Sequence, residues 1–339
     1  MRVVRTYCRI CAPCCGVLVT VDGETVTAVR GDPDNLHSEG YVCPKGRALG
    51  DLHHDPRRLD HPELRVGGVL SPSSWEATLD DLAARIRRAV DVFGPDAVAV
   101  YQGTPALKET AAMPVLGALM RRLGSRSRYS SLTVDISAKL TVTTMVLGAT
   151  LLPVIDMEEA RFLLVLGTNP VVSHGQYNGF FDPIGRLRAI AARGEAWVID
   201  PRRTESAHHA SRYVAIRPGT DHALLAHLVR EVLRRGPDPT VVPYLDGIEV
   251  LRDAVEPWNL DRTVAATGIE AATIEELTAG IERAGRIAIV TGTGLTMARS
   301  GNVSEWLAWA LLLLTGSFDR PGGMWCNCLL YTSPSPRDS

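Results

Sequence analysis

The sequence predicts an α/β protein with a small β-rich domain followed by two interleaved α/β domains, each containing an open parallel sheet. Helical apolar patterns alternate with short apolar runs over most of the chain. The later runs end in loops rich in Gly, Asp, Asn and Thr. Before residue 57, by contrast, apolar and polar residues alternate around Asp22-Gly23, a pair typical of β-hairpin turns.

The β-rich domain is predicted to comprise residues 1–57. Val17, Val19 and Val21 would form one face of its hairpin, because alternate residues of a strand point to the same side. The stretch 56–74 is rich in Pro, Gly and Ser and is interpreted as the connection to the next domain.

The first α/β domain is predicted to be discontinuous, comprising 58–133 and 284–327. A helix is expected from Ser74, because apolar residues recur there every three to four positions. The other predicted elements are a strand at 97–101, a helix from about Ala106, a strand at 287–290 and a helix at 305–314.

The second α/β domain is predicted to comprise residues 134–283. Its apolar runs suit strands buried on both faces of a parallel sheet. Ligands bind at the carboxyl ends of such strands, so the following loops are the expected binding region. The predicted strands span 162–166, 196–199 and 213–216, and the predicted helices span 183–193, 223–234 and 274–283.

Composition argues against several classes of function. The 339-residue chain is 45% hydrophobic and 22% charged and has a formal net charge of −2, so no nucleic-acid partner is indicated. The apolar run 306–315 is too short to cross a bilayer, and we expect no direct membrane span. No leader-like segment precedes the first cysteines, so a cytoplasmic location is expected.

Cysteines are concentrated at the start of the chain. Cys8, Cys11, Cys15 and Cys43 have the spacing C-x2-C-x3-C-x27-C. Three close thiolates and one distant thiolate are typical of an iron–sulfur cluster. A structural zinc site is the alternative, but zinc ribbons usually carry two matched C-x2-C pairs. Cys14 leaves the register open; we assign Cys15, because the glycine after it lets the backbone approach a cluster closely.

This motif, with Gly16 after its third cysteine and Pro44-Lys45-Gly46 after its fourth, resembles the molybdopterin oxidoreductase superfamily. That group includes formate dehydrogenases, nitrate reductases and dimethyl sulfoxide reductase relatives. The resemblance implies a [4Fe–4S] cluster and a bis(molybdopterin guanine dinucleotide) with molybdenum or tungsten. It also implies that Lys45 relays electrons between cluster and pterin; a solvated surface charge is the ordinary alternative.

Loops at the strand ends carry side chains that suit a nucleotide. Aspartates there could accept hydrogen bonds from guanine N–H groups, and an arginine suits phosphate, although turns and helix caps also explain such residues. In their order, the loops resemble the dinucleotide-binding loops of the same superfamily. The resemblance implies that one dinucleotide is held by Thr168, Asn169, Asp200, Arg202 and Asp221. No G-x-G-x-x-G follows these strands, which argues against a nicotinamide cofactor.

Gly292 and Gly294 follow the strand predicted at 287–290. A tight turn that requires positive φ would explain both glycines. A contact with the pterin, which the resemblance implies for this loop, is an equally open explanation.

The metal-ligand position departs from the superfamily pattern. Members usually bind the metal through Cys, selenocysteine, Ser or Asp, and the register of the motif places Thr141 there. Asp135 and Ser137 are the other oxygen candidates. A helix hydroxyl bonded to its own backbone is the ordinary explanation for Thr141.

The last residues differ in character from the rest of the chain. Residues 328–339 resemble the translation of a sequencing-library adapter, so we expect them to be non-native and without function. The superfamily fold continues beyond this point, and the chain is therefore expected to be a fragment.

These observations predict the N-terminal part of a molybdopterin-dependent oxidoreductase catalytic subunit. The fragment as given is expected to be inactive, because the remainder of the superfamily fold is missing. The subunit would pass electrons between the metal centre and the cluster, act on a small-molecule substrate and require a redox partner protein or subunit. The second hypothesis is an electron-transfer subunit of the same fold that has lost the molybdenum site. The third hypothesis is a zinc-stabilised interaction protein.

Overall fold

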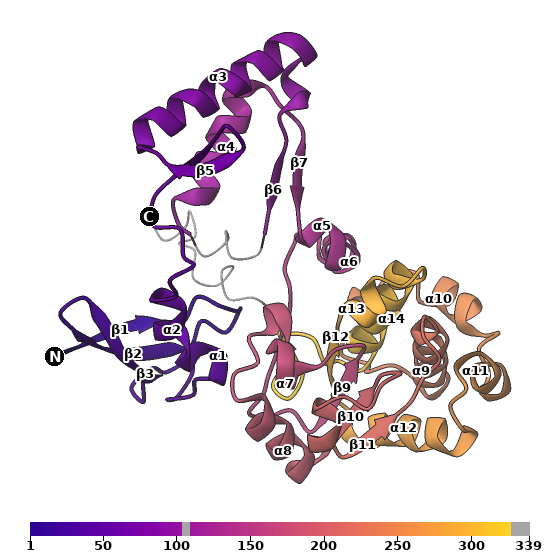
Figure 1. The fold of residues 1–339 in the computed structure, drawn as a ribbon. Coiled ribbons are helices and arrows are strands. Elements are labelled where there is room, and N and C mark those ends of the chain that lie inside the picture. The colour runs from indigo at the N-terminus through magenta and orange to yellow at the C-terminus, as the bar shows by residue number, and fades with distance from the viewer. Residues whose placement is uncertain (104–108, 327–339) are drawn as a thin grey trace, which may run out of the picture. The chain divides into compact units, whose positions relative to one another are not determined.

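The structure is a computed structural model that describes residues 1–103 and 109–326 (Figure 1). It divides into two compact units. Unit 1 comprises Met1–Ile10 and Cys15–Thr133, and unit 2 comprises the described residues of Cys11–Cys14 and Val134–Ser339. The α/β class is confirmed, since parallel strands occur in both units.

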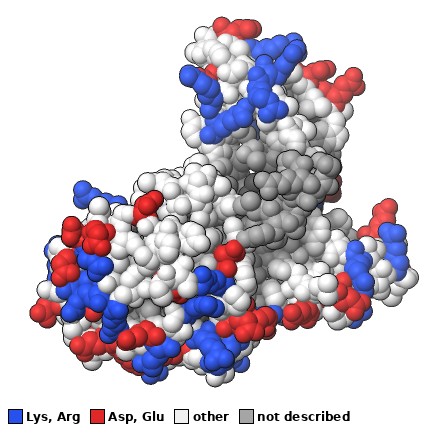
Figure 2. All heavy atoms as spheres, turned by 180° about the vertical axis from the view of Figure 1, so that it is seen from behind, with Lys and Arg blue, Asp and Glu red and all other residues white. Residues whose placement is uncertain are grey.

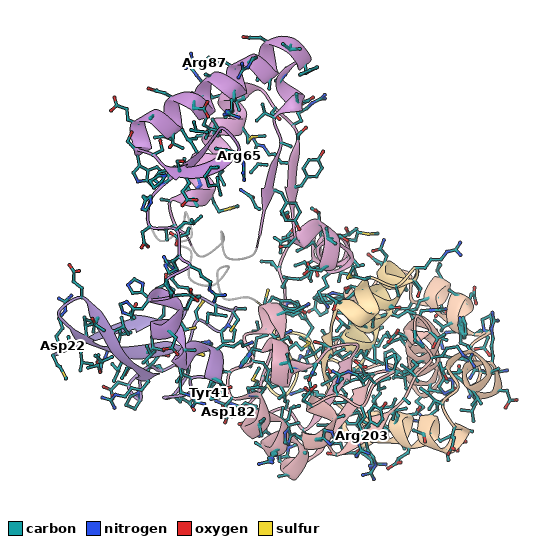
Figure 3. All side chains as sticks on the ribbon, viewed as in Figure 1. Asp22, Tyr41, Arg65, Arg87, Asp182 and Arg203 are labelled. Carbon is teal, nitrogen blue, oxygen red and sulfur yellow. The ribbon has the colours of Figure 1, made fainter. Side chains whose placement is uncertain are left out.

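Unit 1 begins with a three-stranded antiparallel sheet in the order β1-β2-β3. The predicted hairpin is confirmed, and Asp22 lies at its tip (Figure 3). The first strand was not predicted. Val17 and Val42 form a small buried core with Cys8 on this sheet. The elements are β1 Arg2–Tyr7, β2 Gly16–Asp22, β3 Thr25–Gly31, α1 Pro44–Arg47 and α2 Leu49–His53.

The remainder of unit 1 contains a β-hairpin, two long helices and a pair of parallel strands. The predicted strand at 97–101 begins later than expected, because Pro95 starts a 3-10 turn. The predicted helix start at Ala106 lies outside the described residues. The elements are β4 Glu63–Val66, β5 Val69–Pro72, α3 Trp75–Phe93, η1 Pro95–Ala97, β6 Val100–Gln102, α4 Ala112–Leu123, β7 Arg128–Ser130 and, across the unit boundary, α5 Leu132–Asp135.

Unit 2 is built on a parallel sheet with the strand order β11-β10-β9-β12. Helix α8 packs on β9 and β10, α12 packs on β9, and α14 packs on β12. The strands and the helices around them, drawn in Figure 1, are β9 Phe162–Leu166, α8 Pro183–Arg193, β10 Glu195–Ile199, β11 Arg212–Val214, α9 Asp221–Arg235, α12 Ala271–Ala284, β12 Ala288–Thr291 and α14 Gly301–Leu314. All three predicted strands of this region are present, and β9 is buried throughout.

The shorter elements of unit 2 connect this framework. They are α6 Ser137–Leu147, β8 Val154–Ile155, α7 Pro170–Ser173, η3 Gln176–Asn178, η4 Ser206–His209, η5 Val242–Tyr244, α10 Ile248–Val255, α11 Leu260–Thr267, α13 Thr293–Thr296 and β13 Met324–Trp325. Helices α10 and α11 were not predicted. Asp182, labelled in Figure 3, caps α8 by accepting a hydrogen bond from the Gly185 N–H.

The segment 284–327 differs from its prediction. It was expected to return to the first α/β domain, but β12 pairs with β9 over Ala288–Thr291. Its apolar residues require burial on both faces of a sheet, and the free edge of β9 provides that position. The segment therefore completes the sheet of unit 2.

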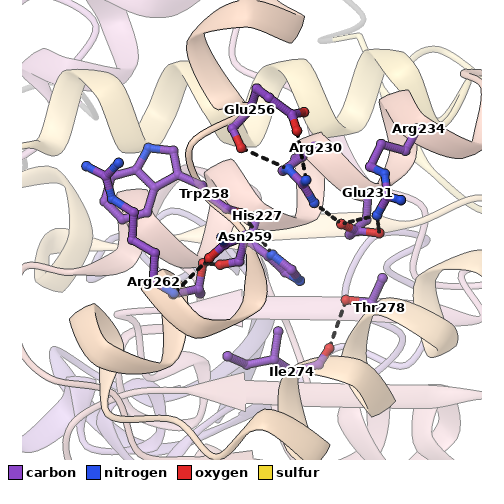
Figure 4. Close-up of polar contacts among 11 residues, drawn as sticks. His227, Arg230, Glu231, Arg234, Glu256, Trp258, Asn259, Arg262, Ile274 and Thr278 are labelled. Atoms are coloured by element: carbon purple, nitrogen blue, oxygen red, sulfur yellow. Dashed lines mark hydrogen bonds and ion pairs between the residues drawn. The ribbon is translucent and has the colours of Figure 1, made fainter.

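Polar contacts join the helices next to this sheet (Figure 4). Arg230 on α9 contacts the carboxylates of Glu231 and Glu256, and the His227 ring shares a hydrogen bond of 3.0 Å with the Trp258 carbonyl. Asn259 caps α11 by accepting a hydrogen bond from the Arg262 N–H. Burial lowers the pKa of His227, so this ring is neutral at physiological pH.

Acidic and basic side chains are intermixed on the face drawn in Figure 2. This agrees with the small net charge of the sequence. Among the described residues, no helix is long and apolar enough to cross a membrane.

Candidate functional site

Two of the predicted cluster cysteines are held opposite each other in unit 1. The β1–β2 ladder ends at the pair Tyr7 and Gly16. One step further, the Cys8 N–H donates a 2.8 Å hydrogen bond to the Cys15 carbonyl. Both cysteines are buried, so the strand pair fixes the two ends of the cysteine loop.

The third predicted ligand in unit 1 is the N-cap residue of a short helix. Cys43 is buried and precedes α1. A Cβ on Gly46 would lie 2.6 Å from Val42 Cγ2, so a larger residue there would press on Val42 in the small core around Cys8. Lys45 is exposed on the same helix. Its role as an electron relay remains a prediction.

Cys11 and Cys14 lie in the short piece of chain that belongs to unit 2. Cys14 has a left-handed backbone with φ of 47° and is half-buried, and its thiol contacts the Cys11 carbonyl. The described residues contain no group of three or more His, Cys, Asp or Glu side chains arranged to hold a metal ion. The assignment of the four ligands therefore stays a prediction from the motif.

The predicted dinucleotide loops of unit 2 all lie at the carboxyl ends of the parallel strands. Loops after β9, β10, β11 and β12 meet at one edge of the sheet. The chain runs outward from β9 to β11 and then returns to the other side of β9. The reversal between β9 and β12 is a topological switch point, where open α/β sheets bind ligands.

Glycines allow the loops at this switch point to touch. The Gly292 N–H donates to the Leu166 carbonyl, and the Gly294 N–H donates to the Gly167 carbonyl. A Cβ on Gly292 would lie 2.3 Å from the Thr168 Cβ. Gly292 has φ of −128°, and Gly294 is absent from the positive-φ residues, so the positive-φ explanation is wrong. Close packing of the two loops requires Gly292, and its predicted pterin contact remains a prediction.

Asn169 ties the loop after β9 to the loop after β10. Its side-chain oxygen accepts hydrogen bonds from the Ser206 N–H and hydroxyl, at 3.1 and 2.7 Å. Its side-chain amide donates to Glu205 at 2.6 Å. Sequence reasoning missed Glu205 and Ser206, because no local pattern marks contacts between residues this far apart in the chain.

Asp200 and Arg202 form a local turn after β10. The Arg202 N–H donates to the Asp200 carboxylate at 2.9 Å, and the Arg202 guanidinium pairs with Glu205 at 3.2 Å. The Arg202 side chain is exposed, so this pair can open to a phosphate at little cost.

Asp221 is the first residue of α9 and is buried. Desolvation, together with the nearby Asp200 carboxylate, raises the pKa of Asp221 to about 6, although a hydrogen bond from its own backbone N–H opposes this. The N-cap residue Thr220 makes no side-chain cap on α9, since its hydroxyl donates to the Arg217 carbonyl instead. A buried carboxylate of this kind suits a ligand that brings its own N–H donors.

The candidate metal ligands lie on or beside α6 in unit 2. Thr141 and Ser137 are exposed on this helix. Asp135 precedes it, and its Oδ1 is buried without a hydrogen-bond partner among the described residues. The structure thus favours an ordinary surface hydroxyl at Thr141. The assignment of Thr141 as the metal ligand stays a prediction.

The residue types fit the groups that the sequence implies. The buried Asp221 and its neighbour Asp200 supply acceptors for a nucleobase, and exposed Arg202 supplies a cation for a phosphate. The buried Cys8, Cys15 and Cys43 supply the sulfur donors that iron–sulfur clusters take.

Unit 1 thus carries Cys8, Cys15 and Cys43 on and beside a small antiparallel sheet, and unit 2 carries the predicted dinucleotide loops on a parallel sheet. The family model described as molybdopterin oxidoreductase Fe4S4 domain matches residues 1–55, and the model described as molybdopterin oxidoreductase matches residues 58–333. The chain belongs to the molybdopterin oxidoreductase family. This match supports both a molybdenum–molybdopterin cofactor and a [4Fe–4S] cluster.

The matches to individual relatives cover only part of each relative's length. The periplasmic nitrate reductase of Desulfovibrio desulfuricans is 31% identical over 232 residues, which are 66% of this chain and 29% of that protein. Formate dehydrogenase H of Escherichia coli is 26% identical over 340 residues, covering 95% of this chain and 46% of that protein. The chain thus spans less than half of the length of these relatives.

A solved structure shows the same fold. Acetylene hydratase from Pelobacter acetylenicus matches with a TM-score of 0.81 and 21% identity, over 94% of this chain and 44% of that chain. At this identity the match supports the fold alone.

Proposed function

We propose that the chain is the N-terminal part of a molybdopterin-dependent oxidoreductase catalytic subunit. Electrons would pass between a molybdenum or tungsten bis(molybdopterin guanine dinucleotide) and a [4Fe–4S] cluster. The observation that carries the proposal is the meeting of four loops at the switch point of unit 2, in a chain that starts with the cluster motif.

The residues of unit 2 would bind and orient the dinucleotide. Asp221 and Asp200 accept hydrogen bonds from guanine N–H groups, and Arg202 neutralises a phosphate after leaving Glu205. Thr168 and Asn169 shape the loop after β9. When bound, the metal–pterin group supplies the two-electron chemistry, while the protein sets its position and surroundings.

In unit 1, Cys8, Cys15 and Cys43, with Cys11, are proposed to hold the cluster, and Lys45 is proposed to relay electrons. A small-molecule substrate and a redox partner protein or subunit belong to this proposal. The cysteine-rich start favours a reducing compartment, so we propose a cytoplasmic location. We further propose that the chain as given is inactive, because it spans less than half of the relatives above.

The alternative is an electron-transfer subunit that has kept the cluster and lost the metal–pterin site. The exposed Thr141, which is not a usual ligand type, favours this alternative.

Metal analysis separates the two functions. The chain is purified without oxygen, its iron, molybdenum, tungsten and pterin are measured, and an EPR spectrum of the reduced protein is recorded. We expect four irons per chain together with pterin. Iron without molybdenum, tungsten or pterin would support the electron-transfer alternative, and a colourless, zinc-containing protein would contradict both.

Variants test the ligand register in the same assay. Cys15→Ala should abolish the [4Fe–4S] signal, because a cluster that loses one of four thiolates is labile. Cys14→Ala is the matched control and should retain the iron. Retention by Cys15→Ala and loss by Cys14→Ala would reverse the assignment.

A further inference from the structure

An ion pair between Lys139 and Glu305 is buried inside unit 2. The two side chains come from α6 and α14, and Lys139 Nζ lies 2.7 Å from Glu305 Oε1. The exposed fractions of the two side chains are only 2% and 5%. Lysine and glutamate are almost never buried to this degree unless they are paired.

The Lys139 ammonium has further partners. It also donates a hydrogen bond to the Thr291 hydroxyl and lies 5.5 Å from the centroid of the Tyr177 ring. Helices α6 and α14, strand β12 and the 3-10 helix η3 therefore all contribute a residue around the Lys139 ammonium. Trp309, Leu312 and Met324 line the same small pocket, so water is largely excluded and the pair is little screened.

Stability alone does not explain why this pair is present. Desolvation of two charges often cancels their attraction, and apolar residues of similar volume can replace buried pairs without loss of stability. What a buried ion pair adds is direction, because the ammonium must lie near its acceptors, whereas apolar side chains can slide. Helix α6 needs such an anchor, since its buried apolar residues are only Ala138 and Val142.

The anchor joins two parts of the proposed cofactor site. Thr291 is the last residue of β12 and directly precedes Gly292 of the switch-point loop. Thr141, at the proposed metal-ligand position, follows Lys139 by two residues on α6 and is exposed. The rotation of α6 about its axis thus determines where the Thr141 face lies relative to the loop after β12.

We propose that Lys139 is a positioning residue that fixes the rotation and axial position of α6 against β12 and α14. The link between this anchor and the metal rests on the proposed function, whereas the anchoring itself does not. The two can therefore fail separately in experiment.

Hydrogen exchange on the chain without added cofactor tests the anchoring. The variant Lys139→Met with Glu305→Met removes both charges, so neither charge is left buried without its partner. Amides of α6 should exchange about tenfold faster, because the helix gains freedom to open locally. Amides of α9 should change less than about twofold.

A matched control removes an exposed pair of the same unit. Arg212 and Glu276 lie 2.9 Å apart, and replacing both by Met should leave α6 exchange unchanged. Equal acceleration over the whole of unit 2 by the Lys139 variant would mean a merely structural pair and would overturn the proposal. Unchanged α6 exchange would do the same.

Two further variants keep the test decisive. Lys139→Arg retains the charge and should restore slow exchange in α6. If the double variant does not fold, Thr291→Val, which removes one acceptor and no charge, should still accelerate α6 exchange. No effect in that variant would contradict the role of Thr291 as the contact to β12.

A spectroscopic measurement tests the link to the metal. In protein that contains molybdenum and pterin, the double variant should shift the Mo(V) EPR signal, while the Arg212 and Glu276 control should not. A shift in exchange without a shift in the EPR signal would refute the link and leave the anchoring intact. Absence of molybdenum from every variant would instead refute the proposed function.

Discussion

Asp221 shows how a residue's position in the fold changes its chemistry. An aspartate at the start of a helix is normally exposed, ionised and stabilising. Here burial and the neighbouring Asp200 raise its pKa to about 6. Between about pH 4 and pH 6 the folded chain binds more protons at this site than the unfolded chain, so the contribution of Asp221 to stability falls as pH rises.

Asp221→Asn should therefore stabilise the free protein at high pH. The shift of roughly two pKa units corresponds to a gain of up to about 3 kcal/mol at pH 8, and to little gain near pH 4. Urea unfolding at the two pH values measures the difference. Asp261→Asn, an exposed aspartate in the first turn of α11, is the control, and an equal gain of Asp221→Asn at both pH values would contradict the expectation.

Gly292→Ala should destabilise unit 2 by about 1–3 kcal/mol, because the added methyl group would overlap the loop after β9. The new Cβ would meet the Gly167 carbonyl oxygen at 2.5 Å, and backbone cannot move aside as a side chain can. Gly117→Ala on α4 is the control, since its nearest neighbour is the flexible end of Arg121 at 3.4 Å. Thermal unfolding compares the two, and equal stability would show that the loops can separate.

Elements differ in how far local sequence predicts them. β9 was recognised because its residues are apolar and buried throughout. β1 was missed because all six of its residues are exposed and carry no alternating pattern; it exists through pairing with β2. Helix α11 was missed because the sequence around it was interpreted as turns. Its N-cap residue Asn259 is the local signal that could have revealed it.

Asn259→Ala should destabilise the protein by about 1 kcal/mol, because the Arg262 N–H would lose its acceptor at the start of α11. Guanidinium unfolding measures this loss. Asn302→Ala, exposed on α14, should change stability by less than about 0.5 kcal/mol. A similar loss in both variants would mean that capping is not the cause.

At the scale of the whole molecule, the two units differ in how much they bury. Helix α3 of unit 1 has no buried residue, whereas α9 of unit 2 buries nine residues, among them Leu224, Leu225 and Leu228. Helices without buried apolar contacts open at low free-energy cost.

Native-state hydrogen exchange should therefore show α3 losing protection before α9, with separate exchange rates for the two units. Mass spectrometry of peptides from both helices measures this, and peptides from β9 provide a slow-exchanging internal control. Identical opening free energies for α3 and α9 would contradict this expectation and indicate that the chain unfolds as one cooperative unit.

The sequence by itself determined the fold class, the cysteine motif and the family, because these depend on residue types and short spacings. Only the tertiary structure decided that β12 joins β9, that Gly292 serves close packing, and that the carboxyl group of Asp221 is buried. Each of these depends on contacts between residues far apart in the chain. An apolar run predicts that a strand is buried but not which strand lies beside it.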